Sequence, residues 1–353
     1  MSTWDAYPTD YRAQEVGTIL AATRTGECVS VIGLSGAGKS NLLGFVAHTQ
    51  STPQRTFVLL DSNQLPAPTA EALFTQLART VAKVPEAEAA ISLEALSALI
   101  DRRLGRPESS LTLLLDRFDV LAASPTLAAN LRALRDAYKY QLTFVTATRR
   151  PLPSRTEFSE LFYAHEIWLG ALAESDARWT VRRYAARHGL AWDATVENRL
   201  LEASAGYPSF LRAMCEAHAE GTALDLASLA VHPAVQQRIG EFLADQPTEN
   251  ELRRAGLMNA PILKASGAPS ASLAGLTAKE ARLLSYFQAH PRVVCEKDDL
   301  IRAVWPEDKV FEAGVRDDSL AQLVRRLREK IEPDAAHPRH IYTAPGRGYR
   351  YEP

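Results

Sequence analysis

The sequence predicts a parallel α/β domain in the first half of the chain, a helical region after it, and a small α+β domain at the C-terminus. Three observations support this division. Short apolar runs alternate with helix-patterned segments, which is typical of a parallel sheet with crossover helices. The glycine-rich stretch "GLSGAGKS" follows the first of these runs. The last part of the chain has three helix-patterned segments and then two β-prone runs.

Length and composition limit the class of protein. With 353 residues the chain exceeds the usual size of one hydrophobic core, so we expect two or three domains. No stretch approaches the roughly 18 uninterrupted apolar residues of a membrane helix, and no signal-like segment opens the chain, so we expect a cytoplasmic protein with no membrane contact. The three cysteines are odd in number and far apart, which favours reduced thiols over disulfides or a zinc site.

The first strand leads into a phosphate-binding loop. Residues 27–32, "ECVSVI", form a short apolar run, and residues 39–47 have a helix pattern. Strand, G-x-x-x-x-G-K-[ST] and helix in this order predict a P-loop. Lys39 and Ser40 have no packing reason to follow the last glycine, which argues against a glycine-rich turn without a ligand. The predicted nucleotide-binding residues of the loop are Gly33, Ser35, Gly36, Ala37, Gly38, Lys39, Ser40 and Asn41.

The chemistry of a P-loop assigns roles to these residues. Backbone N–H groups from Ser35 to Ser40 are expected to point at the β-phosphate, helped by the positive end of the helix dipole. Lys39 is expected to reach the β- and γ-phosphates, and the Ser40 hydroxyl to bind Mg²⁺.

Four further strand-like runs complete the predicted sheet. They are "RTFVLLD" ending at Asp61, "SLTLLLD" ending at Asp116, "QLTFVTATR" ending at Arg149 and "HEIWLGAL" ending at Leu172. Ligands of such sheets bind at the carboxyl ends of the strands. Asp116 is therefore predicted to hold the Mg²⁺ ion and its water shell, although aspartate after a strand is also a common turn residue. The predicted fold of residues 1–172 is an α/β P-loop NTPase core with a parallel sheet.

These motifs together resemble the AAA-related and STAND class of P-loop ATPases, over roughly residues 10–220. The resemblance rests on the lead-in "YRAQEVGTILAATRTGECVSVIGLSGAGKS", the Asp116 strand, "TATRR" and "AGYPSFL". It implies ATP or ADP with Mg²⁺ as ligands and a γ-phosphate sensor at Thr146, Thr148 or Arg149. It also implies that Gly206 and Pro208 form a turn whose proline packs against the adenine. The alternative is an ordinary helix start with proline at its first position.

One departure from the class bears on catalysis. The class usually has a second acid directly after the Mg²⁺-linked one, and here that position is Arg117, which cannot act as a base because it stays protonated. Asp119 is expected either to replace that acid or to cap the following helix. The predicted catalytic residues are Lys39, Asp116, Asp119 and Arg149, with slow turnover. A nucleotide-gated switch fits this pattern better than a motor.

Helix-patterned segments follow the sheet and end in a joint. Residues 173–245 are predicted to be helical, and the resemblance implies that they form a lid over the nucleotide. Residues 246–275 are rich in Pro, Gly, Ser and Ala toward their end and are expected to be a linker or a reduced strand region.

Residues 276–353 are predicted to form a winged helix. The expected helices are residues 276–290, about 296–305 and 318–332, and the hairpin tip is "PGRG" at residues 345–348. "LTAKEARLL", "LVRRLREKIE" and "GRGYRYE" resemble the OmpR-type effector domain of bacterial response regulators. That resemblance implies a third helix in the major groove of DNA and a wing in the minor groove.

Charge places the predicted DNA contacts. The net charge of the chain is −2, which argues against indiscriminate coating of nucleic acid. Between Arg325 and Arg350, however, seven Lys and Arg face three Asp and Glu. The predicted DNA-binding residues are Ser319, Gln322, Arg325, Arg326, Arg328, Arg347 and Arg350. We assign base contacts to Gln322, Arg325 and Arg326, and phosphate or minor-groove contacts to the other arginines.

The function predicted from the sequence is an ATP-controlled, sequence-specific DNA-binding switch, a transcription regulator with slow ATP hydrolysis. Its predicted partners are double-stranded DNA, further copies of itself in an ATP-dependent homo-oligomer, and an unidentified protein or small-molecule activator. Two alternatives stay open. One is a replication-initiator or transposition-type AAA ATPase, and the other is a signalling or defence ATPase whose winged helix docks protein.

Overall fold

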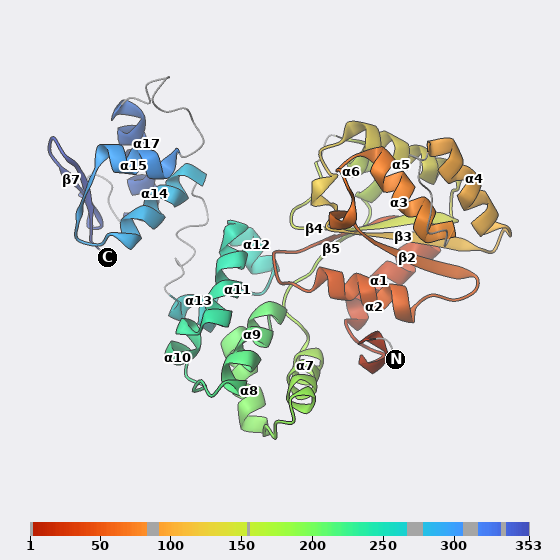
Figure 1. Cartoon of the computed structure of the whole chain (residues 1–353), viewed down its shortest axis with the longest axis horizontal. Coiled ribbons are helices and arrows are strands. Elements are labelled where there is room, and N and C mark those ends of the chain that lie inside the picture. Colours follow the sequence, from red (N-terminus) through yellow and green to blue (C-terminus); the bar gives the residue numbers. More distant parts are fainter. Residues whose placement is uncertain are drawn as a thin grey trace. The chain divides into compact units, whose positions relative to one another are not determined.

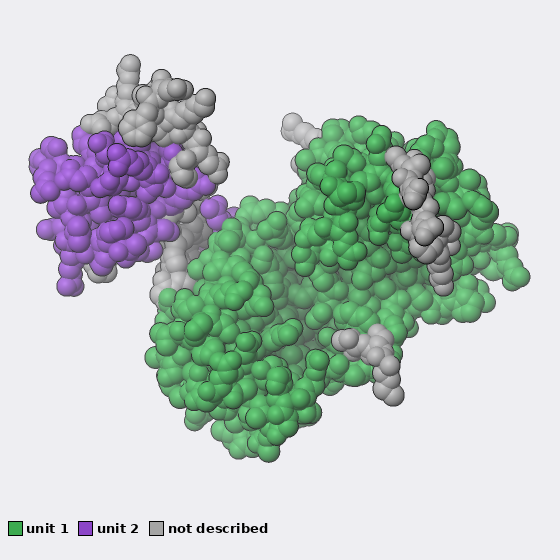
Figure 2. All heavy atoms as spheres, in the orientation of Figure 1, with its two compact units in different colours: residues 1–245, 251–266 green, residues 246–250, 267–353 purple. Residues whose placement is uncertain are grey.

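The computed structural model describes residues 3–82, 92–153, 156–266, 278–305, 317–332 and 337–352. The chain forms two compact units (Figure 2). Unit 1 comprises residues 1–245 and 251–266, and unit 2 comprises residues 246–250 and 267–353. The segments predicted as the P-loop core and as the lid therefore both belong to unit 1.

Unit 1 is built on a parallel five-stranded sheet in the order β2-β3-β4-β1-β5. Its strands are β1 (Val29–Ile32), β2 (Arg55–Asp61), β3 (Ser110–Asp116), β4 (Leu142–Thr148) and β5 (Glu166–Trp168). The predicted parallel sheet is confirmed, and each predicted strand is present. Because β4 lies between β1 and β3, the carboxyl ends of these three strands meet at one edge of the sheet.

The fifth strand is shorter than the sequence predicted, since it ends at Trp168 and not at Leu172. After Trp168 the backbone changes partners. The N–H of Ala171 donates to the carbonyl of Ala255 at 3.2 Å, and the N–H of Leu172 donates to the carbonyl of Gly206 at 2.9 Å. Both acceptors belong to the helical region, so this segment leaves the sheet to join the lid.

Helices cover both faces of the sheet, with α1 and α2 on one face and α3 to α6 on the other (Figure 1). The side chains of strand β3 point alternately toward the helices on the two faces of the sheet. Leu114 packs into the cluster of α1 and α2, whereas Leu113 and Leu115 pack into the cluster of α3 to α6. The helices are α1 (Ala13–Arg24), α2 (Lys39–Thr49), α3 (Ala70–Ala82), α4 (Leu93–Leu104), α5 (Pro125–Ala137) and α6 (Glu157–Phe162), with the short 3₁₀ turns η1 (Thr3–Ala6), η2 (Ser62–Gln64) and η3 (Phe118–Val120).

The region predicted as the lid is helical. Its helices are α7 (Glu174–Arg187), α8 (Ala194–Ser204), α9 (Pro208–Ala219), α10 (Leu226–Val231) and α11 (Pro233–Ala244). In the described part of residues 246–275 the chain is also helical, with α12 (Glu249–Arg254) and α13 (Pro261–Ala265). The rest of that segment, residues 267–275, lies outside the described residues.

Unit 2 has the predicted winged-helix elements. They are α14 (Ala278–Ala289), β6 (Val294–Glu296), α15 (Lys297–Val304), α17 (Asp317–Ile331), β7 (Ile341–Ala344) and β8 (Gly348–Tyr351). The strands form an antiparallel sheet in the order β6-β8-β7. Strand β6 was not predicted, because its three residues are too few to show a period.

A buried arginine joins four segments of unit 1. The guanidinium of Arg12 donates to the carbonyl oxygens of Ala37 and Gly170, each at 3.0 Å, and to the carboxylate of Glu15 at 2.8 Å. Its backbone N–H donates to the carboxylate of Asp176, on α7, at 3.0 Å. The lead-in to α1, the P-loop, the segment after β5 and the lid are thus tied to one residue whose side chain is 1% exposed.

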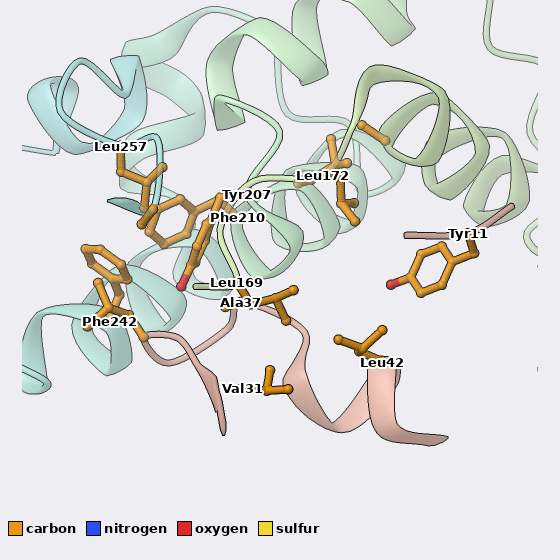
Figure 3. Close-up of a cluster of buried hydrophobic side chains, with 14 of the residues drawn as sticks. Tyr11, Val31, Ala37, Leu42, Leu169, Leu172, Tyr207, Phe210, Phe242 and Leu257 are labelled. Atoms are coloured by element: carbon orange, nitrogen blue, oxygen red, sulfur yellow. The ribbon is translucent and has the colours of Figure 1, made fainter. Parts of the chain in front are cut away.

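An apolar cluster reinforces this junction. Figure 3 shows side chains of the P-loop, the segment after β5 and the lid meeting in one cluster. Among them are Ala37, Leu169, Tyr207 and Phe210, all of which are buried. The helical region predicted as the lid therefore packs on the P-loop through a continuous hydrophobic core.

Arg12→Ala should lower the free energy of unfolding of unit 1 by about 2–4 kcal/mol, because buried carbonyl groups lose their donor. The matched control is Arg24→Ala at the exposed end of α1, which should cost under about 0.5 kcal/mol. Urea unfolding of the full chain, followed by tryptophan fluorescence, measures both. Equal losses in the two variants would contradict the role given to Arg12.

Candidate functional site

The P-loop joins β1 to α2 and needs glycine at two positions. Gly36 and Gly38 have φ angles of 84° and 90°, in the left-handed region. A Cβ atom on Gly36 would also lie 2.1 Å from the hydroxyl oxygen of Ser209 at the start of α9. The loop is therefore shaped by its own turns and by the lid helix that packs against it.

Lys39 begins α2, and its side chain folds back over the loop. Its Nζ atom donates to the carbonyl oxygens of Gly33 at 2.5 Å and Leu34 at 3.3 Å. Burial lowers the pKa of Lys39, and three nearby carboxylates, of which Asp119 has the largest effect, oppose that shift. The ammonium group is thus a buried cation with acidic groups around it.

Asp116 ends β3 and is buried. Its Oδ1 atom accepts from the Arg117 N–H at 3.0 Å. Asp116 and Ser40 line the same cavity, and a carboxylate with a hydroxyl is a set of hard oxygen donors of the kind that Mg²⁺ binds together with phosphate oxygens. The described residues contain no group of three or more His, Cys, Asp and Glu side chains placed to hold a metal. Two oxygen donors on one cavity wall would leave most of the coordination shell of a Mg²⁺ ion to phosphate oxygens and water.

Arg117 and Asp119 follow Asp116, and their contacts exclude one of the two roles that the sequence left open for Asp119. Arg117 has a left-handed backbone, with φ of 52°, and its Nε lies 3.8 Å from Oδ1 of Asp61 at the end of β2. Asp119 accepts from the backbone N–H of Arg149 at 2.8 Å. The alternative that Asp119 caps the following helix is wrong, because Ser124 caps α5.

The three predicted sensor residues differ in position. Thr146 and Thr148 are buried, and within the described residues their hydroxyls have no hydrogen-bond partner. Arg149 is exposed and lines the cavity. Its Nη1 atom lies 3.3 Å from Oδ1 of Asp245, at the end of α11. Arg149 is thus the member of the three that reaches the cavity.

The "GYP" turn packs directly on the P-loop. Gly206 has a φ of 68°, and Pro208 is the first residue of α9, as the helix-start alternative predicts. Pro208 also lines the cavity, with its Cγ atom 3.6 Å from where a Cβ of Gly38 would lie. The hydroxyl of the buried Tyr207 donates to the carbonyl of Ser35 at 2.9 Å. The turn is therefore part of the site wall.

The cavity between the P-loop, the strand ends and the lid has a volume of about 780 Å³. Its wall is mostly polar and contains both signs of charge. The lining residues are Ser35, Gly36, Gly38, Lys39, Ser40 and Asn41 from the P-loop; Asn63, Asp116, Arg117, Asp119, Val120 and Arg149 from the strand ends; and Pro208, Ser209, Arg212, Arg238, Glu241, Ala244 and Asp245 from the lid.

Sequence reasoning missed several residues of this site. Arg212 lies four residues after Pro208 on α9, and that helical spacing was a usable signal. Asp245 had no local signal. Its carboxylate is 5% exposed, and Oδ2 accepts from the backbone N–H of Ser35, 210 positions earlier, at 2.6 Å. Only the fold brings these two residues together.

Unit 2 presents most of its predicted DNA-binding residues to solvent. Ser319, Gln322, Arg325 and Arg326 are exposed on α17, while Leu320, Leu323, Val324 and Leu327 of the same helix are buried. Arg325 pairs with Glu329 at 3.0 Å, a contact within the exposed surface of the helix. On the hairpin, Arg347 pairs with Glu296 at 2.9 Å and Arg350 with Glu352 at 3.1 Å.

Arg328 is engaged inside unit 2. Its guanidinium donates twice to the carbonyl of Ile341, at 2.7 and 3.0 Å, and to the hydroxyl of Thr343 at 2.9 Å. It also lies 5.9 Å from the centre of the Tyr349 ring. The guanidinium thus joins α17 to the hairpin, so its contacts in this structure are structural and do not leave it free for the predicted phosphate contact.

In the part of the chain that the structure describes, no helix is both long and apolar enough to cross a membrane.

Comparison with known proteins gives two family matches. Residues 11–281 match the family described as novel STAND NTPase 1. Residues 272–351 match the family described as transcriptional regulatory protein, C terminal.

Curated relatives and solved structures add partial similarities. The chain is 31% identical over 117 residues to the uncharacterized transcriptional regulatory protein YcbL of Bacillus subtilis, covering 33% of this chain and 50% of the relative. It is 38% identical over 77 residues to transcriptional regulatory protein YvrH of the same organism, covering 22% and 31%. The chain thus spans half or less of the length of these relatives. A Walker-type ATPase of Pyrococcus abyssi matches 99% of this chain and 96% of its own, with 14% identity and a TM-score of 0.49.

Proposed function

Because the chain belongs to the novel STAND NTPase 1 family and carries a transcriptional regulatory C-terminal domain, we propose that it is an ATP-controlled, sequence-specific DNA-binding switch. ATP or ADP with Mg²⁺ binds in the cavity of unit 1, and double-stranded DNA binds to unit 2. The observation that carries the proposal is the convergence of Lys39, Ser40 and Asp116 on one cavity whose opposite wall is the lid.

The proposed roles of the site residues follow from their chemistry. The backbone N–H groups at the start of α2 bind the β-phosphate, and Lys39 exchanges its carbonyl partners for the β- and γ-phosphates. Ser40 and Asp116 hold Mg²⁺, which neutralises charge on the phosphates. Arg149 contacts the γ-phosphate, and Pro208 packs against the base.

The lid is the proposed readout of the nucleotide. Tyr207 and Ser209 bond directly to the P-loop backbone, with the Ser209 N–H donating to the Gly36 carbonyl at 3.2 Å. A phosphate bound in the loop therefore acts on the same backbone that the lid contacts. ATP has a γ-phosphate that ADP lacks. The added negative charge is the kind of small electrostatic change that can bias an element with two conformations.

DNA recognition is assigned to α17 and the hairpin of unit 2. Gln322, Arg325 and Arg326 are exposed and have the hydrogen-bonding groups that read base edges in the major groove. Arg347 and Arg350 are suited to phosphate or the minor groove. The hydrogen bonds of Arg328 to the hairpin support a different role, in which it fixes the hairpin against α17.

Nucleotide binding is tested with Lys39→Ala. Wild-type protein at an ATP concentration one hundred times the Kd should gain about 2.7 kcal/mol of stability, and the variant should gain none. Thermal unfolding with and without Mg²⁺–ATP measures the gain, and Lys139→Ala, at an exposed lysine after α5, is the control. Equal stabilisation of Lys39→Ala by ATP would refute the P-loop assignment.

Hydrolysis should be slow, well below the roughly 1 s⁻¹ at the lower end of typical turnover. The reason is that Arg117 stands where an acid would activate water, while the Asp119 carboxylate is bound to the Arg149 backbone. Phosphate release assays should show a faster Arg117→Glu variant and an unchanged Asp119→Asn variant, which keeps an oxygen acceptor for that backbone. Fast wild-type turnover that is lost in Asp119→Asn would make Asp119 the base.

DNA recognition is tested by titrating specific and scrambled duplexes at two salt concentrations, in the presence of ATP. Arg325→Ala should cost about 1–3 kcal/mol on the preferred site and flatten preference at one base. Arg347→Ala should weaken all sequences alike and reduce the slope of log affinity against log salt by about 1.

Arg328→Ala is the structural comparison, and it should lower the stability of unit 2 by about 1–3 kcal/mol because the Ile341 carbonyl loses its donor. If Arg325→Ala and Arg347→Ala both leave DNA affinity and its salt slope unchanged, unit 2 docks protein and does not read DNA.

A further inference from the structure

Asp245 occupies the P-loop from the lid side. Its Oδ2 atom accepts from the Ser35 N–H at 2.6 Å, and its Oδ1 atom lies 3.3 Å from Nη1 of Arg149. Both contacts are made by a side chain that is 5% exposed. An anionic oxygen group of unit 1 is therefore already bound between a P-loop N–H donor and a cavity arginine.

The Asp245 carboxylate lies beside the loop that would hold a polyphosphate. The β-phosphate of a P-loop ligand binds near the helix N-terminus, which here is the start of α2 at Lys39. Ser35 is four residues earlier, toward the opposite end of the loop, and Arg149 extends from the neighbouring strand β4. With the β-phosphate at the start of α2, a third phosphate would be the part of the ligand nearest to this pair of donors.

A carboxylate and a phosphate compete for the single N–H of Ser35, whereas the guanidinium of Arg149 has further donors. Each carries negative charge and accepts hydrogen bonds, and an N–H group as close as 2.6 Å to one oxygen has no room for a second acceptor. Two anions placed at the same donors would also repel each other. One must leave before the other binds.

We propose that Asp245 is an intramolecular competitor of the γ-phosphate, and that it sets the preference of the site between ATP and ADP. This inference rests on the proposed function, since it assumes that the P-loop binds these nucleotides. ADP binds while Asp245 stays on Ser35 and Arg149. ATP binds only when its γ-phosphate replaces the carboxylate.

Asp245 also lies where the chain leaves unit 1. Asp245 is the last residue of unit 1 before residues 246–250, which group with unit 2, and unit 1 resumes at Glu251. Arg150 contacts the chain on both sides of residues 246–250. Its Nη2 atom donates to the Asp245 carbonyl at 2.5 Å, and its Nε atom lies 3.9 Å from the Glu251 carboxylate. Displacement of the Asp245 side chain therefore acts on a segment that Arg150 contacts on both sides.

The test compares ATP and ADP affinities of the full-length protein by calorimetry, with Mg²⁺ present. Asp245→Ala should raise the affinity for ATP about tenfold, which corresponds to about 1.4 kcal/mol, and leave that for ADP unchanged. Asp245→Asn keeps an oxygen acceptor for Ser35 but loses its charge toward Arg149, so its gain for ATP should be smaller.

Glu241→Gln is the matched control for charge alone. Glu241 lines the same cavity, but its side chain bonds to Gln237 and Arg238, at 3.0 and 2.7 Å, and not to the P-loop. Removing the charge of Glu241 should raise the affinities for ATP and for ADP by similar amounts. Each gain should be smaller than the gain for ATP in Asp245→Ala. An equal gain in Asp245→Ala and Glu241→Gln, or an equal gain for ATP and ADP in Asp245→Ala, would overturn the proposal.

Hydrogen exchange at the Ser35 amide gives a second readout. Without nucleotide this amide should exchange faster in Asp245→Ala than in the wild-type protein, because it has lost its acceptor. Equal exchange rates in the two proteins would also overturn the proposal. Failure of the proposed function looks different: neither the wild-type protein nor Asp245→Ala would bind nucleotide, or Lys39→Ala would bind it equally well.

Discussion

The buried guanidinium of Arg12 is the contact on which the rest of unit 1 depends. Arginine does not lose its charge in a protein interior, so its donors must find acceptors wherever it is buried. Here the acceptors include the backbone carbonyls of Ala37, in the P-loop, and Gly170, in the segment after β5. The charge therefore holds the P-loop against the segment that leads from β5 into the helical region.

The site above this junction is unusually rich in charge for its size. Lys39, Arg149 and Arg117 face Asp116, Asp119 and Asp245 across one cavity. A polyphosphate is the type of ligand that such a cavity suits, because it exchanges one set of anionic oxygens for another without leaving cations unpaired. The carboxylates of the cavity wall thus balance the charge of its cations.

The sequence predicted the features that depend on local pattern. Each strand of the parallel sheet is an apolar run that ends near a polar residue, and the P-loop is defined by glycine, lysine and serine at fixed spacing. It did not predict β6, which has three residues, or the early end of β5, where the backbone of Ala171 bonds to Ala255. Asp245 and Arg12 escaped prediction because their partners lie far away in the sequence. The role of Arg328 escaped because exposed and hairpin-binding arginines look alike on a helix.

Neighbouring residues of α17 differ in what they contact: some attach the helix to the hairpin, and others are exposed to solvent. Arg328 and Glu332 hold the hairpin, since the Glu332 carboxylate accepts from the backbone N–H groups of His340 and Ile341 at 3.0 and 2.8 Å. Gln322 and Arg326 are exposed, and within the described residues they make no contact that joins α17 to the hairpin. Surface residues of this helix can therefore change during evolution without loss of the fold of unit 2.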